Sequence, residues 1–174
     1  KLDFLIQSLV KLSRMEGGII AVHSEDTTIK QMLESIQQQF NVKVREKNIT
    51  LSLCDTDLHV RCDSKWTVEA LGNIVDNAIK YTACGGNVQI KAEQYSFFVK
   101  IDIIDDGIGI EKEEIPKIFG RFYRSLSVAD QPGVGIGLFL AREIIQAQKG
   151  YIKVTSKRGK GSTFSVFLPI AKKE

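Results

Sequence analysis

The sequence predicts a two-layer α/β (α+β) sandwich, in which helices pack on one face of a mixed, largely antiparallel sheet. Segments with apolar residues at helical spacing alternate with pairs of segments that have strand periodicity, in the order helix–strand–strand, three times over. This order is typical of helices that cover one side of an antiparallel sheet. Because the chain is 174 residues long and 43% hydrophobic, it can bury the core of about one domain.

The composition excludes several classes of function. The formal net charge of +3 comes without a dense Lys and Arg run interleaved with aromatic residues, which argues against nucleic acid binding. Cys54, Cys62 and Cys84 are odd in number and lack C-x-x-C spacing, so neither a disulfide framework nor a zinc site is indicated, and a reducing, cytosolic setting fits best. No apolar run approaches a membrane span, the N-terminus is not a signal peptide, and the first residue looks like a cut inside a larger protein.

The first 18 residues are predicted to be an appendage. Leu2, Leu5, Leu9 and Leu12 follow a heptad-like spacing that suits the seam of a helical hairpin or bundle, and a glycine pair at 17–18 ends the helix. Such a stripe needs a partner helix that this chain does not contain. The alternative is an N-terminal helix docked on its own domain.

The remaining residues, 19–174, are assigned to one domain. Its helices are predicted over 28–45, from a cap at Asp63 to about 82, and from Gly137 to about 148. Its strands are predicted over 49–53, 59–62, 87–93, 97–104, 151–156 and 163–168.

The helix after Asp63 carries an unusual polar stripe. Glu69, Asn73, Asn77 and Lys80 recur at steps of four, four and three, so they line one side of the helix. Asparagine is a mediocre helix former, and a routine solvated face would favour Glu, Lys and Gln. We therefore interpret this helix as one wall of a polar site rather than as a solvated surface.

A predicted strand runs into an Asp-x-Gly-x-Gly turn at Asp105, Gly107 and Gly109. An Asp-Gly pair also favours a β-hairpin, but the residues from Glu111 read as a helix start and not as another alternating strand. The glycines allow the backbone to approach a flat ligand closely. A carboxylate at the end of a buried strand could accept a hydrogen bond from an exocyclic amino group, which adenine offers where guanine offers an oxygen.

Gly133, Gly135 and Gly137 lead straight into the last helix and favour a phosphate site. Free backbone N–H groups and the positive helix end would hold the anion. The motif is not a P-loop, because no Gly-Lys-Ser/Thr follows, and it is not a convincing dinucleotide fingerprint, because a polar loop precedes it instead of a strand. Alone, this motif is a weak signal.

The segment between the two glycine motifs predicts a lid. Phe119 and Phe122 are expected to be buried anchors, and the polar stretch Ser125–Pro132 is long enough to close over a nucleotide. Arg124 is positioned to meet phosphate oxygens, although a plain surface arginine is an equal interpretation. The glycine-rich turn before Thr163 is mainly structural, although the Thr163 hydroxyl could reach the ligand.

Together these motifs resemble the N, G1, F, G2 and G3 boxes of the ATP-binding catalytic domain of sensor histidine kinases. That domain belongs to the superfamily shared with DNA gyrase and heat-shock chaperones. The five boxes are, in order, Asn73-x-x-x-Asn77-Ala, Asp105-x-Gly107-x-Gly109, Phe119-x-x-Phe122, Gly133-x-Gly135-x-Gly137 and Gly161-Ser-Thr163. The resemblance covers roughly residues 25–170 and implies a Bergerat-type ATP-binding fold with a five-stranded sheet. Residues 1–18 resemble the end of the second helix of a dimerisation and phosphoacceptor domain.

The resemblance implies ATP and Mg²⁺ as ligands and gives each matched residue a role. Asn77 would bind the Mg²⁺ that bridges the phosphates, with Asn73 and Lys80 beside it, and Arg124 would face the γ-phosphate. Asp105 would hold the adenine amino group. The remaining ATP contacts are expected from Tyr81, Gly107, Gly109, Ile110, Gly133, Val134, Gly135, Gly137, Leu138 and Thr163. Catalysis in such a site, carried by Asn73, Lys80 and Arg124, is mostly positioning and charge neutralisation.

The chain also departs from the family pattern. His23 lies in a linker and His59 in a strand, and neither has the context of a phosphoacceptor histidine, so we expect ATP binding without self-phosphorylation. Gly120 replaces the polar residue more usual in the F box, which would loosen the lid hinge. The implied partners are a phosphoacceptor domain of the same protein, homodimeric in the intact kinase, and a response regulator, without nucleic acid or membrane contact. The implied location is the cytoplasmic portion of a membrane-anchored bacterial receptor.

Two other functions remain open. An ATP hydrolase of the same superfamily needs a general base, typically a Glu at the position of Asn73, and an amide cannot take a proton. A nucleotide-sensing module without catalysis would be expected to lose Asn77 or the lid glycines, and both are present. The sequence therefore favours transfer of the γ-phosphoryl group to a histidine.

Overall fold

The computed structural model describes residues 22–128, 131 and 133–171, together with positions 6, 10 and 13. Those three positions are helical, but the rest of the appendage predicted at 1–18 lies outside the described residues. The division into 1–18 and 19–174 therefore stays a prediction.

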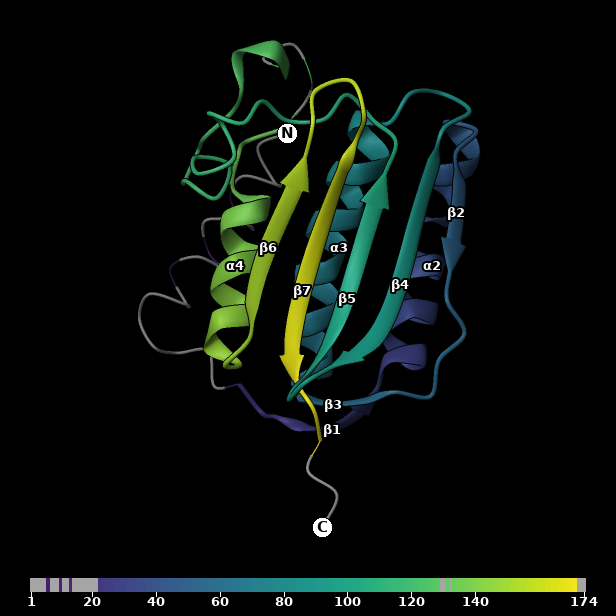
Figure 1. Cartoon of the computed structure of the whole chain (residues 1–174), viewed down its shortest axis with the longest axis vertical. Helices are drawn as coiled ribbons and strands as arrows, with labels where there is room; N and C mark the ends of the chain where they lie inside the picture. Colours follow the sequence, from purple (N-terminus) through teal and green to yellow (C-terminus); the bar gives the residue numbers. More distant parts are fainter. Residues whose placement is uncertain are drawn as a thin grey trace.

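Five strands form the main sheet, in the order β2-β4-β5-β7-β6 (Figure 1). Their bounds are β2 (Thr50–Leu53), β4 (Asn87–Tyr95), β5 (Phe98–Asp105), β6 (Tyr151–Ser156) and β7 (Ser162–Pro169). β2 pairs parallel with β4, and every other neighbouring pair in this sheet is antiparallel. The predicted mixed, largely antiparallel five-stranded sheet is confirmed.

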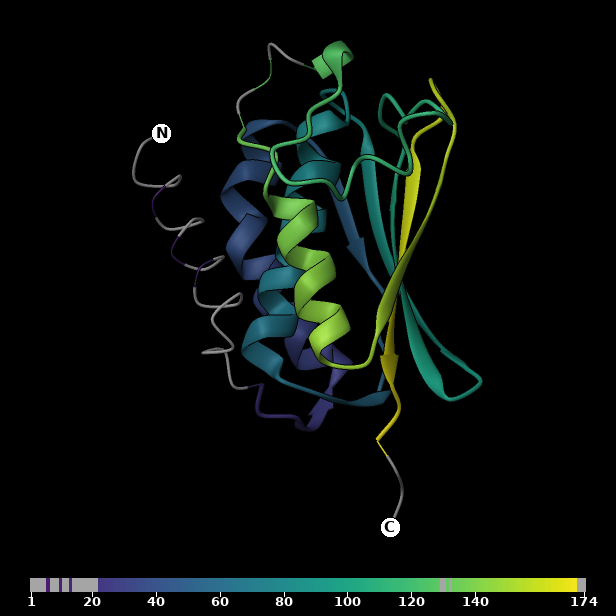
Figure 2. The ribbon, with the colours of Figure 1, turned by 90° about the vertical axis from the view of Figure 1, so that its left-hand side faces the viewer.

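Three helices cover one face of this sheet, so the molecule has two layers (Figure 2). They are α2 (Ile29–Glu46), α3 (Ser64–Tyr81) and α4 (Gly137–Ala147). Thr28 caps α2 by accepting a hydrogen bond from the Gln31 amide, and Asp63 caps α3 by accepting one from the Trp66 amide. Among the residues described, no helix is both long enough and apolar enough to cross a bilayer.

A small second sheet joins two short antiparallel strands, β1 (Glu25–Thr28) and β3 (His59–Cys62). The sequence predicts β3 but not β1, because β1 reads Glu-Asp-Thr-Thr and has no alternating apolar residues. The Asp26 carboxylate lies 2.6 Å from His59 Nδ1, across this pair. The chain entering α2 is thereby held against the chain entering α3.

The hydrophobic core lies between the helices and the inner face of the sheet. Alternation along β5 buries Val99, Ile101 and Ile103 on that face. The same alternation puts Asp105, the last residue of the strand, on the inner face with only 8% of its surface exposed. A carboxylate at the edge of an apolar layer marks this end of the sheet for a polar ligand.

The segment after the Asp-x-Gly-x-Gly turn is not a helix. Its hydrogen bonds mainly join residues three apart: the Glu114 amide donates to the Glu111 carbonyl, Lys117 to Glu114, and Gly120 to Lys117. Pro116 lies within it and has no N–H to donate. The expectation of a helix starting at Glu111 is therefore wrong, and a run of turns leads to the lid.

Candidate nucleotide-binding site

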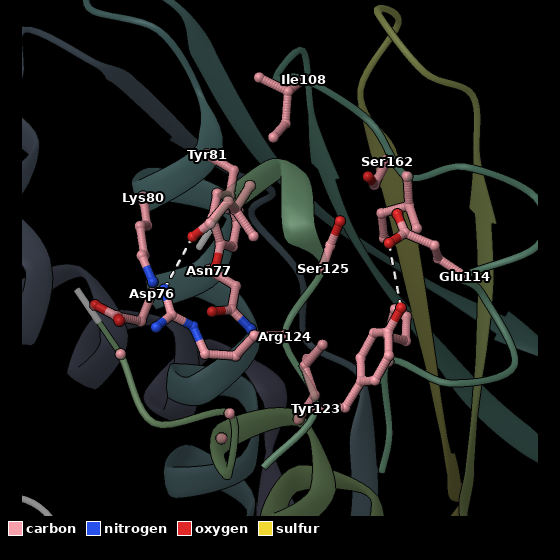
Figure 3. A pocket seen from close by; sticks show the side chains of 18 of the residues that line it. Asp76, Asn77, Lys80, Tyr81, Ile108, Glu114, Tyr123, Arg124, Ser125 and Ser162 are labelled. Atoms are coloured by element: carbon pink, nitrogen blue, oxygen red, sulfur yellow. Dashed lines mark hydrogen bonds between the residues drawn. The ribbon is translucent and has the colours of Figure 1, made fainter. Parts of the chain in front are cut away.

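A pocket opens at the end of the sheet where β5 finishes. α3, the turn after β5, the segment at 114–128, the residues at 133–138 and the start of β7 all contribute to its wall (Figure 3). The predicted ATP-binding residues that line it are Asn73, Asn77, Lys80, Tyr81, Asp105, Gly109, Ile110, Arg124, Gly133, Val134, Gly135, Gly137 and Leu138. The structure thus brings together residues from the N, G1 and G2 boxes with Ser162 of the G3 box, but it leaves Gly107, Thr163 and the F-box residues 119–122 outside the lining.

The Asp105 carboxylate is held by backbone groups. Its Oδ1 accepts hydrogen bonds from the Gly107 amide at 2.9 Å and from the Ser162 amide at 3.3 Å. Burial raises the pKa of Asp105 above the ordinary aspartate value, and the two amide hydrogen bonds offset part of that rise. Both amides bond Oδ1, and within the described residues Oδ2 has no hydrogen bond, so Oδ2 can accept one from a ligand.

Gly107 supports the pocket from behind instead of lining it. A Cβ at Gly107 would lie 2.6 Å from the Tyr81 carbonyl oxygen, so only glycine lets this turn reach the end of α3. The Ile108 amide donates to the same carbonyl at 3.2 Å. Gly107 thus allows a close approach of two backbones, and its expected ATP contact stays a prediction.

The structure does not bring Thr163 to the pocket. Side chains alternate along β7, and the pocket is lined by Ser162 and Phe164, on the same face as Asp105. Thr163 pairs with Ile104 and belongs to the opposite face of the sheet. The expected ligand contact of Thr163 stays a prediction, and the hydroxyl that lines the pocket is that of Ser162, which strand alternation counted back from a buried Phe164 would have indicated.

The far end of the pocket is lined by groups that suit an anion. α4 begins at Gly137, and no side chain among the described residues caps it, so its first N–H groups are available in that part of the structure. Both Gly137 and Leu138 line the pocket. Asn73 Nδ2 is buried without a hydrogen-bond partner in the described part of the chain. A Cβ at Gly137 would lie 3.4 Å from Asn73 Oδ1, so this amide faces the helix start directly.

Two cationic side chains reach the same end. Figure 3 shows Lys80 and Arg124 on one side of the pocket beside Asp76, with Ser162 and Glu114 on the other side. The Lys80 ammonium would lie 2.9 Å from a Cβ at Gly133, so the glycine leaves room for it. These charges make this side of the pocket favourable for phosphate oxygens.

Arg124 also braces the lid. Its guanidinium donates to the Val128 carbonyl at 2.9 Å and to the Gln131 carbonyl. These bonds close a turn that includes the short 3₁₀ helix η1 (Leu126–Val128). Arg124 thus lines the pocket as expected, while its hydrogen bonds hold the lid turn in shape.

The two lid anchors differ from expectation. Phe119 is half-buried against the core, with the Arg142 guanidinium 5.7 Å from its ring centroid, but Phe122 is 54% exposed and has a left-handed backbone with φ +59°. A Cβ at Gly135 would lie 3.1 Å from Phe122 Cα and 2.6 Å from the Tyr123 carbonyl oxygen. The prediction of a buried Phe122 is wrong, because its backbone and not its ring makes the close contact with Gly135.

A family model settles the kinship that this geometry suggests. Residues 62–172 match the model described as Histidine kinase-, DNA gyrase B-, and HSP90-like ATPase, which spans α3, most of the main sheet and every box above. The chain belongs to this ATPase family. The predicted resemblance is confirmed, and the pocket lies where the boxes of an ATP-binding catalytic domain of sensor histidine kinases meet.

The relatives of this ATPase domain are sensor kinases. Sensor protein kinase PmrB of Pseudomonas aeruginosa is 29% identical over 170 residues, which are 97% of this chain and 36% of PmrB. Sensor histidine kinase WalK of Bacillus subtilis is 33% identical over 170 residues, which are 95% of this chain and 28% of WalK. The histidine kinase AdeS of Acinetobacter baumannii has a structure with a TM-score of 0.78 at 25% identity, covering 98% of this chain and 79% of that one. The chain therefore spans about a third of the curated relatives it matches.

The ATPase pocket also has lining residues that the boxes do not indicate. The Tyr123 hydroxyl donates to Glu114 at 3.2 Å across the lid base, and burial is the first cause that raises the pKa of Tyr123. Ile108 and Phe164 contribute apolar walls near Asp105. These positions carry no sequence signal of their own, because ordinary core and surface residues have the same types.

The donor set of the pocket suits a metal that a ligand brings with it. Within the described ranges, no group of three or more His, Cys, Asp or Glu side chains could hold a metal ion. Mg²⁺ commonly binds through phosphates, waters and one or two protein oxygens. The Asn77 amide in the pocket wall fits that mode, so these residues are compatible with Mg²⁺ on a triphosphate.

Proposed function

We propose that this chain is the ATP-binding catalytic domain of a two-component sensor histidine kinase. It binds ATP and transfers the γ-phosphoryl group to a histidine on a dimerisation and phosphoacceptor domain of the same protein. The observation that carries the proposal is the Asp105 carboxylate, buried at one end of a pocket whose other end carries an uncapped helix start and two cations. Family membership and the sensor kinase relatives support it.

The base is recognised at the Asp105 end. A carboxylate oxygen accepts from the adenine amino group but repels the guanine oxygen at the same place. Ile108, Ile110 and Phe164 line this part of the pocket and give the flat base an apolar environment. Adenine is therefore selected over guanine by one acceptor, already held in position by two backbone amides.

The triphosphate lies toward α3 and α4. Asn77 would hold Mg²⁺ through its amide oxygen, and the metal supplies charge neutralisation on the phosphates when it is bound. Lys80 and Arg124 offer positive charge on the same side of the pocket, and the first amides of α4 complete the anion site. Chemistry in such a site consists of holding the γ-phosphoryl in line with an incoming nucleophile.

The nucleophile is a histidine and not water. A superfamily hydrolase would use a carboxylate at the position of Asn73 as general base. The Asn73 amide, buried with Nδ2 unpaired in the described structure, can donate a hydrogen bond but cannot accept a proton. The pocket therefore protects the γ-phosphoryl until a protein acceptor arrives.

The partners follow from this reaction. A dimeric phosphoacceptor domain of the same protein receives the phosphoryl group, and a response regulator takes it onward. We place the chain in the cytoplasmic portion of a membrane-anchored bacterial receptor, in keeping with the sensor kinases it resembles.

The test supplies the chain with γ-labelled ATP, Mg²⁺ and a separate phosphoacceptor domain from its own parent protein. Label that is acid-labile and base-stable on that domain, and lost when its histidine is replaced, supports the kinase. Release of labelled inorganic phosphate at the same rate with and without the acceptor would instead identify a hydrolase. ATP binding without any turnover would leave a nucleotide-sensing module.

A further inference from the structure

Arg158, in the turn between β6 and β7, contacts both sides of the pocket mouth. Its Nη1 lies 3.4 Å from the Gly109 carbonyl oxygen and 3.3 Å from Ser127 Oγ, and its Nε lies 3.9 Å from a Glu111 carboxylate oxygen. We infer that Arg158 is a positioning residue. It joins the lid turn, which contains Ser127, to the turn after Asp105, which contains Gly109 and is called the base-binding turn below, and it thereby sets the rate at which nucleotide dissociates. The inference rests on the proposed function, since it requires a nucleotide in the pocket.

The Arg158 contacts, called the latch below, start from a β6–β7 turn that is held firmly against the base-binding turn. The Gly159 amide donates to the Ile108 carbonyl at 2.7 Å, and a Cβ at Gly109 would lie only 2.1 Å from the Lys157 carbonyl oxygen. The β6–β7 turn therefore packs directly on the turn that follows Asp105. Because the backbone of Arg158 is fixed there, its side chain starts from a defined position beside the pocket.

A second set of bonds ties the same two turns together. The Ile110 amide donates to Ser156 Oγ at 2.8 Å, and Ser156 Oγ in turn donates to the Gly161 carbonyl at 2.9 Å. These bonds do not involve the Arg158 side chain. Removing that side chain should thus leave the base-binding turn in place and release only what the guanidinium holds.

The lid side is braced within itself. Ser127 and Ser125 share a hydrogen bond between their hydroxyls at 2.8 Å, the Ser127 amide donates to Ser125 Oγ at 3.2 Å, and the Val128 amide donates to the Ser125 carbonyl at 3.1 Å. Arg124 closes the same turn through the Val128 carbonyl. Ser125, Ser127 and Val128 all line the pocket, so one bond from Arg158 to Ser127 positions the inner wall of the lid.

An arginine suits this place better than a lysine. A guanidinium presents several N–H donors in a fixed plane, so it can reach a carbonyl, a hydroxyl and a carboxylate together. The Arg158 side chain is 40% exposed, so water can replace each contact and the latch can open. Weak, replaceable contacts are appropriate for a lid that must release product.

The experiment measures nucleotide dissociation from the full chain by stopped flow. A ribose-labelled fluorescent ATP is bound in Mg²⁺ buffer and then chased with excess unlabelled ATP. Arg158→Ala should raise the dissociation rate by about 3- to 30-fold, the range expected for losing hydrogen bonds from a partly exposed charged donor, with little change in the association rate. The dissociation rate of Arg158→Lys should lie between those of the wild type and Arg158→Ala.

Ser127→Ala removes the hydroxyl that Arg158 contacts, together with its hydrogen bond to the Ser125 hydroxyl, and leaves Gly109 untouched. Ser127→Ala should also raise the dissociation rate. The rate of the double variant with Arg158→Ala should not exceed that of Arg158→Ala alone, since both substitutions remove the same Arg158–Ser127 contact. Lys160→Ala, exposed on the same turn, is the matched control and should behave as the wild type.

An unchanged dissociation rate in Arg158→Ala would overturn the inference. So would a faster rate in Arg158→Ala but not in Ser127→Ala, because Arg158 would then act on the base-binding turn alone. The inference would also fail if the double variant dissociated nucleotide at a rate raised by the product of the two single-variant factors, because the two residues would then act independently. A wild-type chain that binds no ATP contradicts the proposed function itself, which is a different result.

Discussion

The two ends of the pocket are built in different ways. At the proposed adenine end, Asp105 is 8% exposed and is fixed by backbone amides from two neighbouring segments. At the proposed phosphate end, the Lys80 and Arg124 side chains lie beside a lid turn that Arg158 contacts through partly exposed groups. In the proposed function, base selection therefore depends on a carboxylate that backbone amides hold in place, while phosphate binding and release depend on side chains and on the lid turn.

The largest effect is expected from Asn77→Ala, at the phosphate end. Losing the proposed metal ligand should lower Mg²⁺-dependent phosphoryl transfer by about 100- to 1000-fold, because a fixed electrostatic contact to the transferring group is lost. The measurement is labelled transfer to the phosphoacceptor domain. Gln89→Ala, exposed on the outer face of β4, is the control and should transfer normally. Transfer retained in Asn77→Ala would remove this residue as the metal ligand.

A smaller effect is expected at the proposed adenine end of the pocket. Asp105→Asn should weaken ATP by about 10- to 100-fold, since a hydrogen bond to a charged group contributes about 1.5–3 kcal/mol. Asp106→Asn is the matched control, because Asp106 bonds the backbone and side chain of Asn87 and does not line the pocket. Calorimetry with both variants checks this, and equal affinity in Asp105→Asn and wild type would reject the adenine assignment.

The two neighbouring carboxylates should also respond differently to pH. Burial raises the pKa of Asp105, whereas hydrogen bonds from Asn87 lower the pKa of Asp106. ATP affinity should therefore fall as pH drops through the raised pKa of Asp105, where Asp106 is still ionised. Comparing wild type with Asp105→Asn removes the titration of the nucleotide itself, and identical pH profiles would contradict the prediction.

The same raised pKa has a consequence for the nucleotide-free chain. The folded state holds the Asp105 proton to higher pH than the unfolded state, so the contribution of Asp105 to the free energy of unfolding is largest below the unfolded-state pKa. It declines as pH rises from there to the raised folded-state pKa and is constant above it. Denaturant unfolding of wild type against Asp105→Asn over this range measures the sign. A contribution that grows with rising pH would be inconsistent with desolvation as the main cause.

The smallest effect separates the two phenylalanines of the lid base. Phe119→Ala should lower the free energy of unfolding by about 2 kcal/mol, because its ring packs against the core. Phe122→Ala should change it by less than about 0.5 kcal/mol, because its ring is exposed. Urea unfolding of both variants makes the comparison, and a larger loss in Phe122→Ala would restore it as a buried anchor.

The adenine end of the pocket could be predicted from the sequence because the local periodicity of β5 determines it. Alternation along β5 is visible in the sequence and places Asp105 at the end of a buried strand. The glycines at 107 and 109 mark the close turn, although the partner of Gly107, the Tyr81 carbonyl, depends on tertiary packing. Ser162 and Thr163 are neighbours in β7 and face opposite sides of the sheet. Only the register with β5, in which Ser162 pairs with Asp105, indicates which hydroxyl lies on the pocket side.

The lid end could not be predicted in the same detail. The segment from Glu111 has the composition of a helix start, yet it forms turns whose hydrogen bonds mainly span three residues. Phe122 is apolar and lies in a motif, but its left-handed backbone turns the ring to solvent. The contact between Arg158 and Ser127 joins residues 31 apart on irregular segments, and no sequence periodicity indicates it.

The most direct test of base selection by Asp105 is the ratio of ATP to GTP affinity in wild type and in Asp105→Asn, measured by calorimetry in Mg²⁺ buffer. The phosphates are the same in both ligands, so the ratio isolates the base end from the lid. We expect wild type to bind ATP at least about tenfold more tightly than GTP, and the variant to lose most of that preference. Equal ATP and GTP affinities in wild type, or a preference that survives in Asp105→Asn, would contradict the assignment of base selection to this carboxylate.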